Sequence, residues 1–530
     1  MKTRYIWIMA MAVVALTGCQ KERVNGNLEL IAEGMNGNTK LAINGLQSYW
    51  VAGESVRINN NNYTISVNSE ENGRAYVDSD DEVTAPYCGV YPASIYSSNA
   101  GTDYVLDLPA SYIYATTTFN SQTVQNLASP MVAFADDGAT SLYFKHVTAA
   151  IGVEITNNFG IDVRVTNITV SSNKYKLNGE VEVAFGESIT VNAEEATGEG
   201  DAAKRQVVMN FTGTPLEIVS GASATVQVPV LPVGNDNRFT ISVTVQNKDD
   251  AEMEYTFSKT QANGQSSYTL TRAQIGYAPA KFGGVFTVSS GKQVRFAPGN
   301  LLYDKSADKY SFMKHQYDME EANGSVGTDY SSRTTVSLFN WYGVNPTETS
   351  STAGDYPSPY ADWGTTAFGS ESGWYTLTKN EWVYLTNGER VNSTTGLEGT
   401  SAAKFVKGKV DDVCGLFIFC DNYVHPSDAT ISYNSPTFNG SSTYVKFTVS
   451  SENWKKMEVA GAIFLPVSGN RSGEDVSNVN SYGYYWASDE YNGRGYSLSI
   501  GNYGFTPNYN STPQSNKYNG CSVRLVRDVQ

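Results

Sequence analysis

The residues best suited to recognising a ligand lie near the end of the chain, in the 32-residue stretch Asp489–Gly520. This stretch holds six Asn, five Tyr, four Ser and five Gly, but few core-type apolar residues. Tyr offers contact area at low entropy cost, while Asn and Ser offer adaptable hydrogen bonds, as in antibody-like binding loops. We predict a ligand-binding surface composed of Tyr491, Asn492, Arg494, Tyr496, Asn502, Tyr503, Asn508, Tyr509, Asn510, Asn516 and Tyr518. The alternative is a solvated Asn-rich loop that binds nothing.

Catalytic chemistry has few candidates. The chain has 3 His and 5 Cys, too few to suggest a zinc enzyme or a disulfide scaffold. It contains no His-Glu-x-x-His, Gly-x-Ser-x-Gly or phosphate-loop motif. His146, His315 and His425 are expected to be structural. Glu381 is expected to complete a capping box begun by Thr378 rather than to act as an acid. The sequence therefore predicts a non-enzyme.

Calcium is the one cofactor that remains open. The ion takes roughly six to eight oxygen ligands. Acidic side chains in predicted loops are candidate donors: Asp304, Asp308, Asp411, Asp412, Asp489 and Glu490. None belongs to a complete calcium-loop motif, so solvated acidic loops are the simpler interpretation. We predict no metal site and no cofactor, with calcium as the alternative.

Length and charge limit the class of protein. The chain has 530 residues, which suggests about three domains at ~100–200 residues each. Its 37 Lys and Arg against 53 Asp and Glu give a net charge of −16. Nucleic acids and anionic membrane surfaces require a basic protein face, so neither is an expected partner.

The N-terminus has the pattern of an export signal. Lys2 and Arg4 are followed by the apolar run Ile6–Leu16, which is too short to span a bilayer stably. The small residues before Cys19 resemble a lipobox, which implies cleavage before Cys19 and lipidation of its thiol. An ordinary signal peptide is the alternative. A lipid anchor would hold the folded chain at a membrane.

Four further cysteines would meet an oxidising compartment: Cys88, Cys414, Cys420 and Cys521. On one strand, Cys414 and Cys420 would lie on the same face but ~20 Å apart, so they cannot pair with each other. We expect both to be buried as small apolar residues. The sequence does not decide whether Cys420 and Cys521 form a disulfide.

Residues 27–275 read as strands, because apolar and polar residues alternate in segments rich in Val, Ile, Thr and Tyr. Short strands separated by turn signals favour β-sandwiches. Four segments resemble landmarks of the fimbrillin superfamily of Bacteroidetes: Thr39-Lys40, Trp50–Glu54, Tyr91–Ser94 and Phe144–Ala150. Glu54 stands where that family usually has Asp. An unrelated β-sandwich lipoprotein is the alternative.

The fimbrillin resemblance implies assembly by strand addition. A protease removes the first strand, and a partner subunit's strand then completes the open sheet through main-chain hydrogen bonds. Lys40 is the candidate cleavage site, with Lys21 and Arg23 as alternatives. Because Lys40 replaces the family's Arg, cleavage by an Arg-specific protease is in doubt.

Residues 281–530 contain six of the eight tryptophans and differ in composition from the preceding part. A short helix N-capped by Thr378 is expected, and another after Ser451. The segment resembles a family of bacterial surface domains with a C-type-lectin-like fold, related in fold to formylglycine-generating enzyme. The matching segments are Phe296–Leu301, Gln316–Asp318, Leu377–Trp382, Gly461–Pro466, Tyr484–Ser488 and Ser522–Val526. That enzyme needs a reactive thiol pair near the chain end, where only Cys521 lies, so the resemblance does not extend to its chemistry.

The stretch Asp489–Gly520 also resembles the variable region of diversity-generating retroelement targets, which share the C-type-lectin-like fold. Adenine-directed mutation of Asn codons yields residue types in which this stretch is rich. Sequencing the 3′ end of the gene across a population tests this hypothesis, which uniform sequences would contradict.

The predicted fold is a mainly β N-terminal part with two fimbrillin-type β-sandwiches, followed by an α+β C-type-lectin-like domain. The boundaries are a signal peptide (1–18), a tether (19–26), the sandwiches (27–140 and 141–275), a linker (276–284) and the binding domain (285–530). The predicted function is that of an outer-membrane, surface-exposed lipoprotein adhesin, a tip or accessory fimbrial subunit. Its partners would be other fimbrial subunits and a glycan or protein on another cell. A structural shaft pilin or anchor and an enzyme of the formylglycine type are the alternatives.

Overall fold

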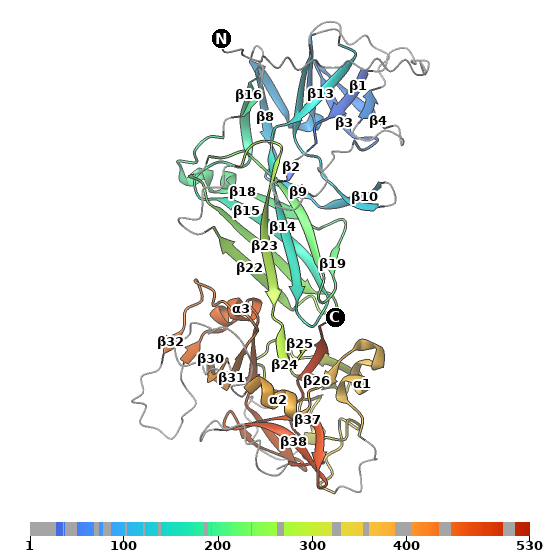
Figure 1. The fold of residues 1–530 in the computed structure, drawn as a ribbon, viewed down its shortest axis with the longest axis vertical. Coiled ribbons are helices and arrows are strands. Elements are labelled where there is room, and N and C mark those ends of the chain that lie inside the picture. Colours follow the sequence, from blue (N-terminus) through green and yellow to red (C-terminus); the bar gives the residue numbers. More distant parts are fainter. Residues whose placement is uncertain are drawn as a thin grey trace, which may run out of the picture. The chain divides into compact units, whose positions relative to one another are not determined.

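The computed structural model describes residues 28–34, 36–37, 50–67, 74–77, 86–100, 103–119, 122–135, 139–184, 189–191, 193–234, 236–261, 270–320, 330–352, 360–386, 404–433, 447–501 and 515–529. This part of the chain is mainly β (Figure 1), as the sequence predicts. It forms two compact units. Unit 1 comprises Met1–Asp107, Ala128–Thr148 and Glu182–Val191, and unit 2 comprises Leu108–Leu127, Ala149–Val181 and Asn192–Gln530.

Unit 1 is built on a closed barrel rather than on the expected two-sheet sandwich. Its strands in spatial order are β1 (Leu28–Ala32), β13 (Ser141–His146), β12 (Met131–Ala135), β6 (Tyr87–Tyr91), β3 (Ser55–Ile58), β4 (Asn61–Ser66) and β5 (Arg74–Val77). The barrel closes because β1 pairs with β13 on one side and with β5 on the other. Alternation along a strand predicts one buried face but does not tell whether the outer strands meet.

Three aromatic residues from the segments that resemble fimbrillin landmarks pack together in the core of the barrel. The ring of Trp50 packs edge-on against Tyr91, with centroids 5.0 Å apart, and against Phe144, with centroids 5.3 Å apart. The Tyr91 hydroxyl donates a hydrogen bond to the Glu54 carboxylate. Edge-to-face pairs add to the free energy of burial. These residues therefore stabilise the barrel.

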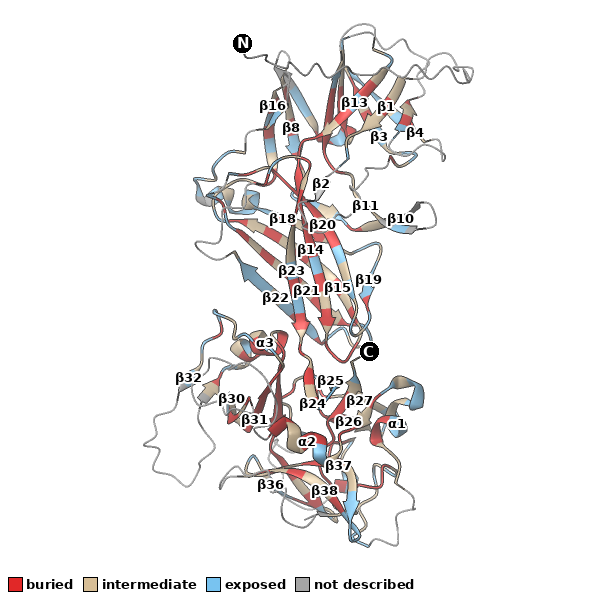
Figure 2. Ribbon diagram, viewed as in Figure 1, coloured by how far each residue is buried: buried red, intermediate tan, exposed pale blue. Residues whose placement is uncertain are grey.

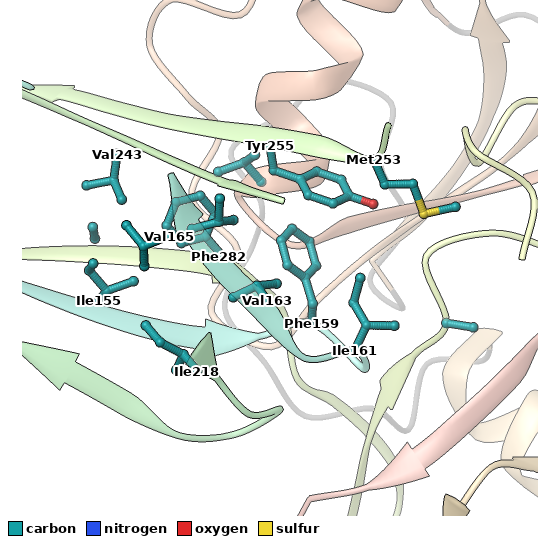
Figure 3. Close-up of a cluster of buried hydrophobic side chains, with 14 of the residues drawn as sticks. Ile155, Phe159, Ile161, Val163, Val165, Ile218, Val243, Met253, Tyr255 and Phe282 are labelled. Carbon is teal, nitrogen blue, oxygen red and sulfur yellow. The ribbon is translucent and has the colours of Figure 1, made fainter. Parts of the chain in front are cut away.

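Unit 2 begins with two sheets that share one apolar core. One sheet contains β23 (Gln274–Gly283), β14 (Ala149–Asn158) and β20 (Ser223–Val230). The other contains β22 (Glu254–Thr260), β21 (Phe239–Asn247), β15 (Val163–Ser172), β18 (Gln206–Asn210), β9 (Ser111–Ile113) and, beside β15, β19 (Leu216–Ile218). Buried and half-buried residues alternate along β15 and β21 (Figure 2). Side chains from both sheets meet in the cluster that Figure 3 shows.

Strand β9 pairs in parallel with β18, which follows it by about a hundred residues. The hairpin of β10 (Ala115–Phe119) and β11 (Gln122–Asn126) also belongs to unit 2. In the sequence, the segment 108–127 of unit 2 thus lies between two segments of unit 1, Met1–Asp107 and Ala128–Thr148. A pairing between segments so far apart has no local sequence signal.

The C-terminal part of unit 2 contains short sheets and helices. The first sheet contains β24 (Phe286–Ser289), β25 (Lys292–Phe296), β40 (Leu525–Asp528) and β29 (Tyr375–Thr376), and the second contains β27 (Lys309–Phe312), β26 (Leu301–Asp304) and β28 (Thr335–Val336). The third contains β32 (Ser432–Tyr433), β33 (Phe447–Val449), β30 (Phe405–Val410), β31 (Val413–Phe419) and β34 (Ala462–Pro466). The fourth contains β36 (Asp475–Val479), β35 (Ser468–Ser472), β37 (Gly483–Tyr491), β38 (Arg494–Ile500) and β39 (Ser515–Asn516). The helices are α1 (Trp363–Phe368), α2 (Lys379–Thr386) and α3 (Ser451–Val459).

The helix ends follow the sequence closely. The Glu381 amide donates to Thr378 Oγ1 at 3.3 Å and the Thr378 amide donates to Glu381 Oε2 at 2.7 Å, which is the predicted capping box. For α3 the capping residue is Ser450, whose Oγ accepts from the Asn453 amide at 3.3 Å. The sequence predicts that α3 begins after Ser451, but Ser451 is already the first residue of the helix, so the predicted start is one residue too late.

The buried Arg524 joins several of the segments that carry the C-type-lectin resemblance. Its guanidinium donates to Asn300 Oδ1 at 2.9 Å, to Gln316 Oε1 at 3.0 Å and to the Phe464 carbonyl at 2.9 Å. Burial lowers the pKa of Arg524 to about 10. Each bond offsets part of the cost of burying the charge, so these segments are held together by one buried cation.

Candidate functional site

A β-hairpin carries four of the predicted binding residues. Strands β37 and β38 are joined by Asn492 and Gly493, whose φ angles are 50° and 78°. Two successive residues with positive φ form the type I′ turn, whose twist matches that of a hairpin, and Asn-Gly is its preferred sequence. The sequence therefore sets this turn locally. Figure 1 shows the hairpin beside α2.

Three side chains form a row across the hairpin and the strand that follows it. Tyr491 is directly opposite Arg494, and Arg494 is directly opposite Asn516 on β39. Directly opposed residues point to the same face of a sheet. Tyr491 is 52% exposed, and Arg494 is exposed as well. The row, called here the Tyr491–Arg494–Asn516 row, offers a phenol, a guanidinium and an amide side by side.

Buried tryptophans fix the backbone beneath this row. The Trp486 indole donates to the Phe339 carbonyl at 2.6 Å, and the Trp341 indole donates to the Ala487 carbonyl at 2.9 Å. From α2, Trp382 donates to the Trp486 carbonyl at 3.3 Å. Such bonds hold rings that also bury large apolar areas. The hairpin therefore emerges from a rigid base.

The opposite face of the hairpin packs against Trp341. A Cβ on Gly495 would lie 2.5 Å from Trp341 Cδ1, so only glycine allows this approach. Lys517 places its ammonium 4.3 Å from the centroid of the Trp341 ring and forms an ion pair with Glu490. Burial lowers the pKa of Lys517. This face therefore serves mainly to hold the hairpin in place.

Tyr496 connects the row to α2. Its ring lies under the ammonium of Lys379, 4.3 Å from the centroid, and the Lys379 backbone amide donates to the Asp489 carboxylate. The sequence prediction missed Lys379, which lies outside the stretch Asp489–Gly520. Its position just after the capping residue Thr378 marks a helix start, but no sequence signal brings it to Tyr496.

The predicted binding residues do not all share one face. Tyr491, Arg494 and Asn516 lie together, Asn492 is exposed in the turn, and Tyr496 is half-buried under Lys379. Tyr518 instead packs against the apolar core of unit 2. The remaining predicted positions lie outside the described residues: Asn502, Tyr503, Asn508, Tyr509 and Asn510.

Three of the candidate calcium donors, Asp304, Asp308 and Asp411, have separate hydrogen-bond partners. Asp304 accepts from the amides of Ser306 and Ala307 at 2.8 and 3.1 Å and from the Ser306 hydroxyl, which lower the pKa of its carboxyl. Asp308 accepts from a tyrosine hydroxyl, and Asp411 from the Ser451 amide. Among the described residues, no three Asp, Glu, His or Cys side chains form a group that could hold a metal ion.

The histidines and thiols have structural surroundings. In unit 1, His146 is 2% exposed and lies 3.1 Å from the Ser129 hydroxyl and 3.0 Å from the Glu33 carbonyl. In unit 2, His425 contacts a tyrosine hydroxyl and the Ala429 carbonyl. Among the described residues, no disulfide joins any two of the four cysteines: Cys88, Cys414, Cys420 and Cys521. Cys414 and Cys420 are buried, as expected, and neither is bridged to Cys521.

Comparisons with known proteins give distant matches only. No protein-family model matches the chain, and no curated protein matches it. Among solved structures, a candidate cell adhesion protein from Bacteroides ovatus is 12% identical, with a TM-score of 0.26, over 48% of this chain and 93% of its own. A fimbrial protein from Bacteroides vulgatus is 9% identical, with a TM-score of 0.20, over 48% of this chain and 95% of its own. TM-scores this low do not establish a shared fold, so function is argued from the residues of this chain.

The candidate cleavage site Lys40 and the candidate lipidation site Cys19 lie outside the described residues. None of the described helices is long and apolar enough to cross a membrane.

Proposed function

We propose that this chain is a surface-exposed lipoprotein adhesin, a tip or accessory subunit of a fimbrium that binds a glycan or a protein on another cell. The observation that supports this proposal best is the Tyr491–Arg494–Asn516 row, in which Tyr491 and Arg494 are exposed, on a hairpin held by buried tryptophans. Rigid elements that present exposed aromatic and polar side chains suit recognition, because little conformational entropy is lost on binding.

The chemistry of the row suits a polar ligand with flat or acidic groups. Tyr491 offers a ring and a hydroxyl, and Asn516 offers both a donor and an acceptor. Arg494 can donate two parallel hydrogen bonds to a carboxylate and can stack on a ring. Sugars and polar peptide surfaces both present such groups, so the ligand class stays a glycan or a protein.

Assembly with other subunits is proposed to use the edge of β22. This strand ends its sheet, and a groove of about 230 Å³ runs beside it, lined by Phe239, Ile241 and Phe257. The edge of β20 is different, because the side-chain amide of Gln125 already bonds both backbone groups of Gln227 at 2.8 and 2.9 Å. An added strand at β22 would find main-chain partners and an apolar groove together.

The proposal includes a lipid anchor at Cys19 in the outer membrane and maturation at Lys40. It is tested by sequencing the mature N-terminus on cells and by assaying higher-order species. A chain that keeps Cys19 as its first residue and stays monomeric contradicts strand addition. The β22 edge would also serve a shaft pilin or anchor without a ligand, which is the second candidate function.

We propose no catalytic activity. The thiol of Cys414 is buried, which raises its pKa and disfavours the reactive thiolate. Among the described residues, no disulfide joins Cys521 to Cys88, Cys414 or Cys420. An oxidase of the formylglycine type is the disfavoured alternative, and an assay on a cysteine-containing peptide tests it directly.

The binding proposal is tested with the full chain on glycan arrays, surface-protein arrays and whole cells, with and without calcium. The double variant Tyr491→Ala/Arg494→Ala should bind at least about thirtyfold more weakly, the effect of losing one hot spot. The matched control is Tyr143→Ala/Arg238→Ala, which removes an exposed Tyr and an exposed Arg elsewhere. Equal loss in both variants would contradict this site. Absence of binding by the unaltered chain would favour the shaft pilin.

A further inference from the structure

The open face of the β37–β38 hairpin carries two positive charges beside its exposed tyrosines. Arg494 is exposed, and its guanidinium forms no hydrogen bond or ion pair with another described residue. Tyr496 lies two residues further along β38, so it shares a face of the strand with Arg494. The ammonium of Lys379 lies 4.3 Å from the centroid of the Tyr496 ring and forms no ion pair within the described ranges. The two cations therefore lie on either side of one tyrosine ring.

One carboxylate lies close to these cations. Asp489 accepts a hydrogen bond from the Lys379 backbone amide at the start of α2, where the helix dipole also favours a negative charge. Counted together, Arg494, Lys379 and Asp489 leave one positive charge in excess. The binding face is thus locally basic.

The opposite face of the same hairpin is neutral by comparison. There, Lys517 forms an ion pair with Glu490 and places its ammonium over the Trp341 ring. The cation that packs against the protein is therefore neutralised, whereas those on the open face are not. The chain as a whole has a net charge of −16, so a locally basic face is not a consequence of its composition.

The neighbours of Arg494 suit a sugar better than an acidic peptide side chain. Tyr491 and Asn516 are directly opposite Arg494 on the two adjacent strands, where Cβ atoms are roughly 4.5–5.5 Å apart. One ring-shaped ligand can thus reach all three side chains. The phenol ring offers a flat surface for the C–H face of a sugar, and the amide can both donate to and accept from a hydroxyl. A carboxylate on a peptide would use the cations alone.

We infer that the hairpin binds a sugar that carries a carboxylate, such as a uronic or a sialic acid. Arg494 takes the carboxylate through two parallel hydrogen bonds, and Lys379 adds a second positive charge. Tyr491 and Asn516 hold the sugar ring and its hydroxyls. The inference rests on the proposed adhesin function and narrows its ligand from a glycan or a protein to an acidic glycan.

The inference is tested by saturation-transfer difference NMR on the full chain with matched pairs of probes. Methyl β-glucuronide and methyl β-glucoside differ in one carboxylate, and 3′-sialyllactose and lactose differ in one sialic acid. Acetate and a capped Gly-Glu-Gly peptide carry a carboxylate without a sugar. At least one acidic sugar should bind with a Kd of about 1 mM or below, and at least about tenfold more tightly than its neutral partner.

Three substitutions locate the site. Arg494→Gln should weaken binding of the acidic sugar by about tenfold or more, the effect of hydrogen bonds to a charged group, and Arg494→Lys should lose less. Lys379→Gln should weaken it by up to about fivefold, as for an exposed ion pair. The matched control is Arg238→Gln/Lys309→Gln, which removes two exposed cations elsewhere and should leave the affinity unchanged. Unaltered urea unfolding confirms that each variant is folded.

Four results would overturn the inference: no binding of either acidic sugar, equal binding of neutral and acidic sugars, a peptide that binds as tightly as the sugars, or equal loss in the control. The adhesin proposal fails separately. Cell or array binding that needs Tyr491 and Arg494 but shows no preference for acidic sugars would keep the adhesin and remove this inference. Binding of acidic sugars without binding to any cell or array would contradict the adhesin and keep the carboxylate site.

Discussion

The buried carboxyl of Glu458 should make the protein less stable as the pH rises. Burial raises its pKa from the ordinary value of 4.5 to about 7. The folded chain therefore holds a proton that the unfolded chain releases at lower pH. This stabilisation is complete below about pH 4.5 and is lost as the pH rises through about 7.

The magnitude follows from the size of the shift. At 1.36 kcal/mol per pKa unit, the change from 4.5 to about 7 corresponds to about 3 kcal/mol. Between about pH 5 and about pH 8, roughly 2–3 kcal/mol of this should disappear. Total stabilities of about 5–15 kcal/mol make such a loss easy to detect.

Other groups near Glu458 titrate as well. Burial raises the pKa of Asp318, which acts in the same direction, and lowers the pKa of His315, which acts in the opposite direction. Burial also raises the pKa of Tyr255, beyond the range of the experiment. Comparing the chain with its Glu458→Gln variant isolates the contribution of Glu458.

The assay is urea unfolding followed by tryptophan fluorescence, which reports mainly on residues 281–530, where six of the eight tryptophans lie. Glu458→Gln should lose most of the pH dependence and should be at least as stable as the unaltered chain at about pH 8, because no buried carboxylate has to form. Glu371→Gln, at an exposed position, should keep the original slope. A Glu458→Gln variant with an unchanged slope, or with lower stability at about pH 8, would refute the reasoning.

Four further substitutions test the support of the hairpin and the helices. Gly495→Ala should cost about 1–3 kcal/mol in urea unfolding and weaken ligand binding, since its Cβ would lie 2.5 Å from Trp341; unchanged stability and binding would contradict the packing of this face. Thr378→Ala should cost about 1 kcal/mol by removing the cap of α2, while Ser450→Ala should do the same for α3, and a loss at Ser451→Ala instead would contradict the observed helix start. Leu498→Ala, at a 1% exposed position, should cost about 2–5 kcal/mol by opening a cavity, and a loss below about 1 kcal/mol would show that β38 is not part of the core.

The sequence by itself determined features that depend on neighbouring residues. The Asn492-Gly493 turn, the capping box of Thr378 and Glu381, and the alternation along β14, β15 and β21 are local, and all are found in the structure. Burial of Leu498 and Ile500 within the Tyr- and Asn-rich stretch was also predictable from their apolar character.

Only the tertiary structure decided which distant segments meet. It closes the strands of unit 1 into a barrel, brings Lys379 over Tyr496, and separates Tyr518 from the Tyr491–Arg494–Asn516 row. It also connects Arg524 to Glu458 through hydrogen bonds to and from the side chain of Gln316. Periodicity specifies which face of a strand is buried, but the partner strand, the register and the burial of a charge depend on the whole chain, because non-local contacts alone set them.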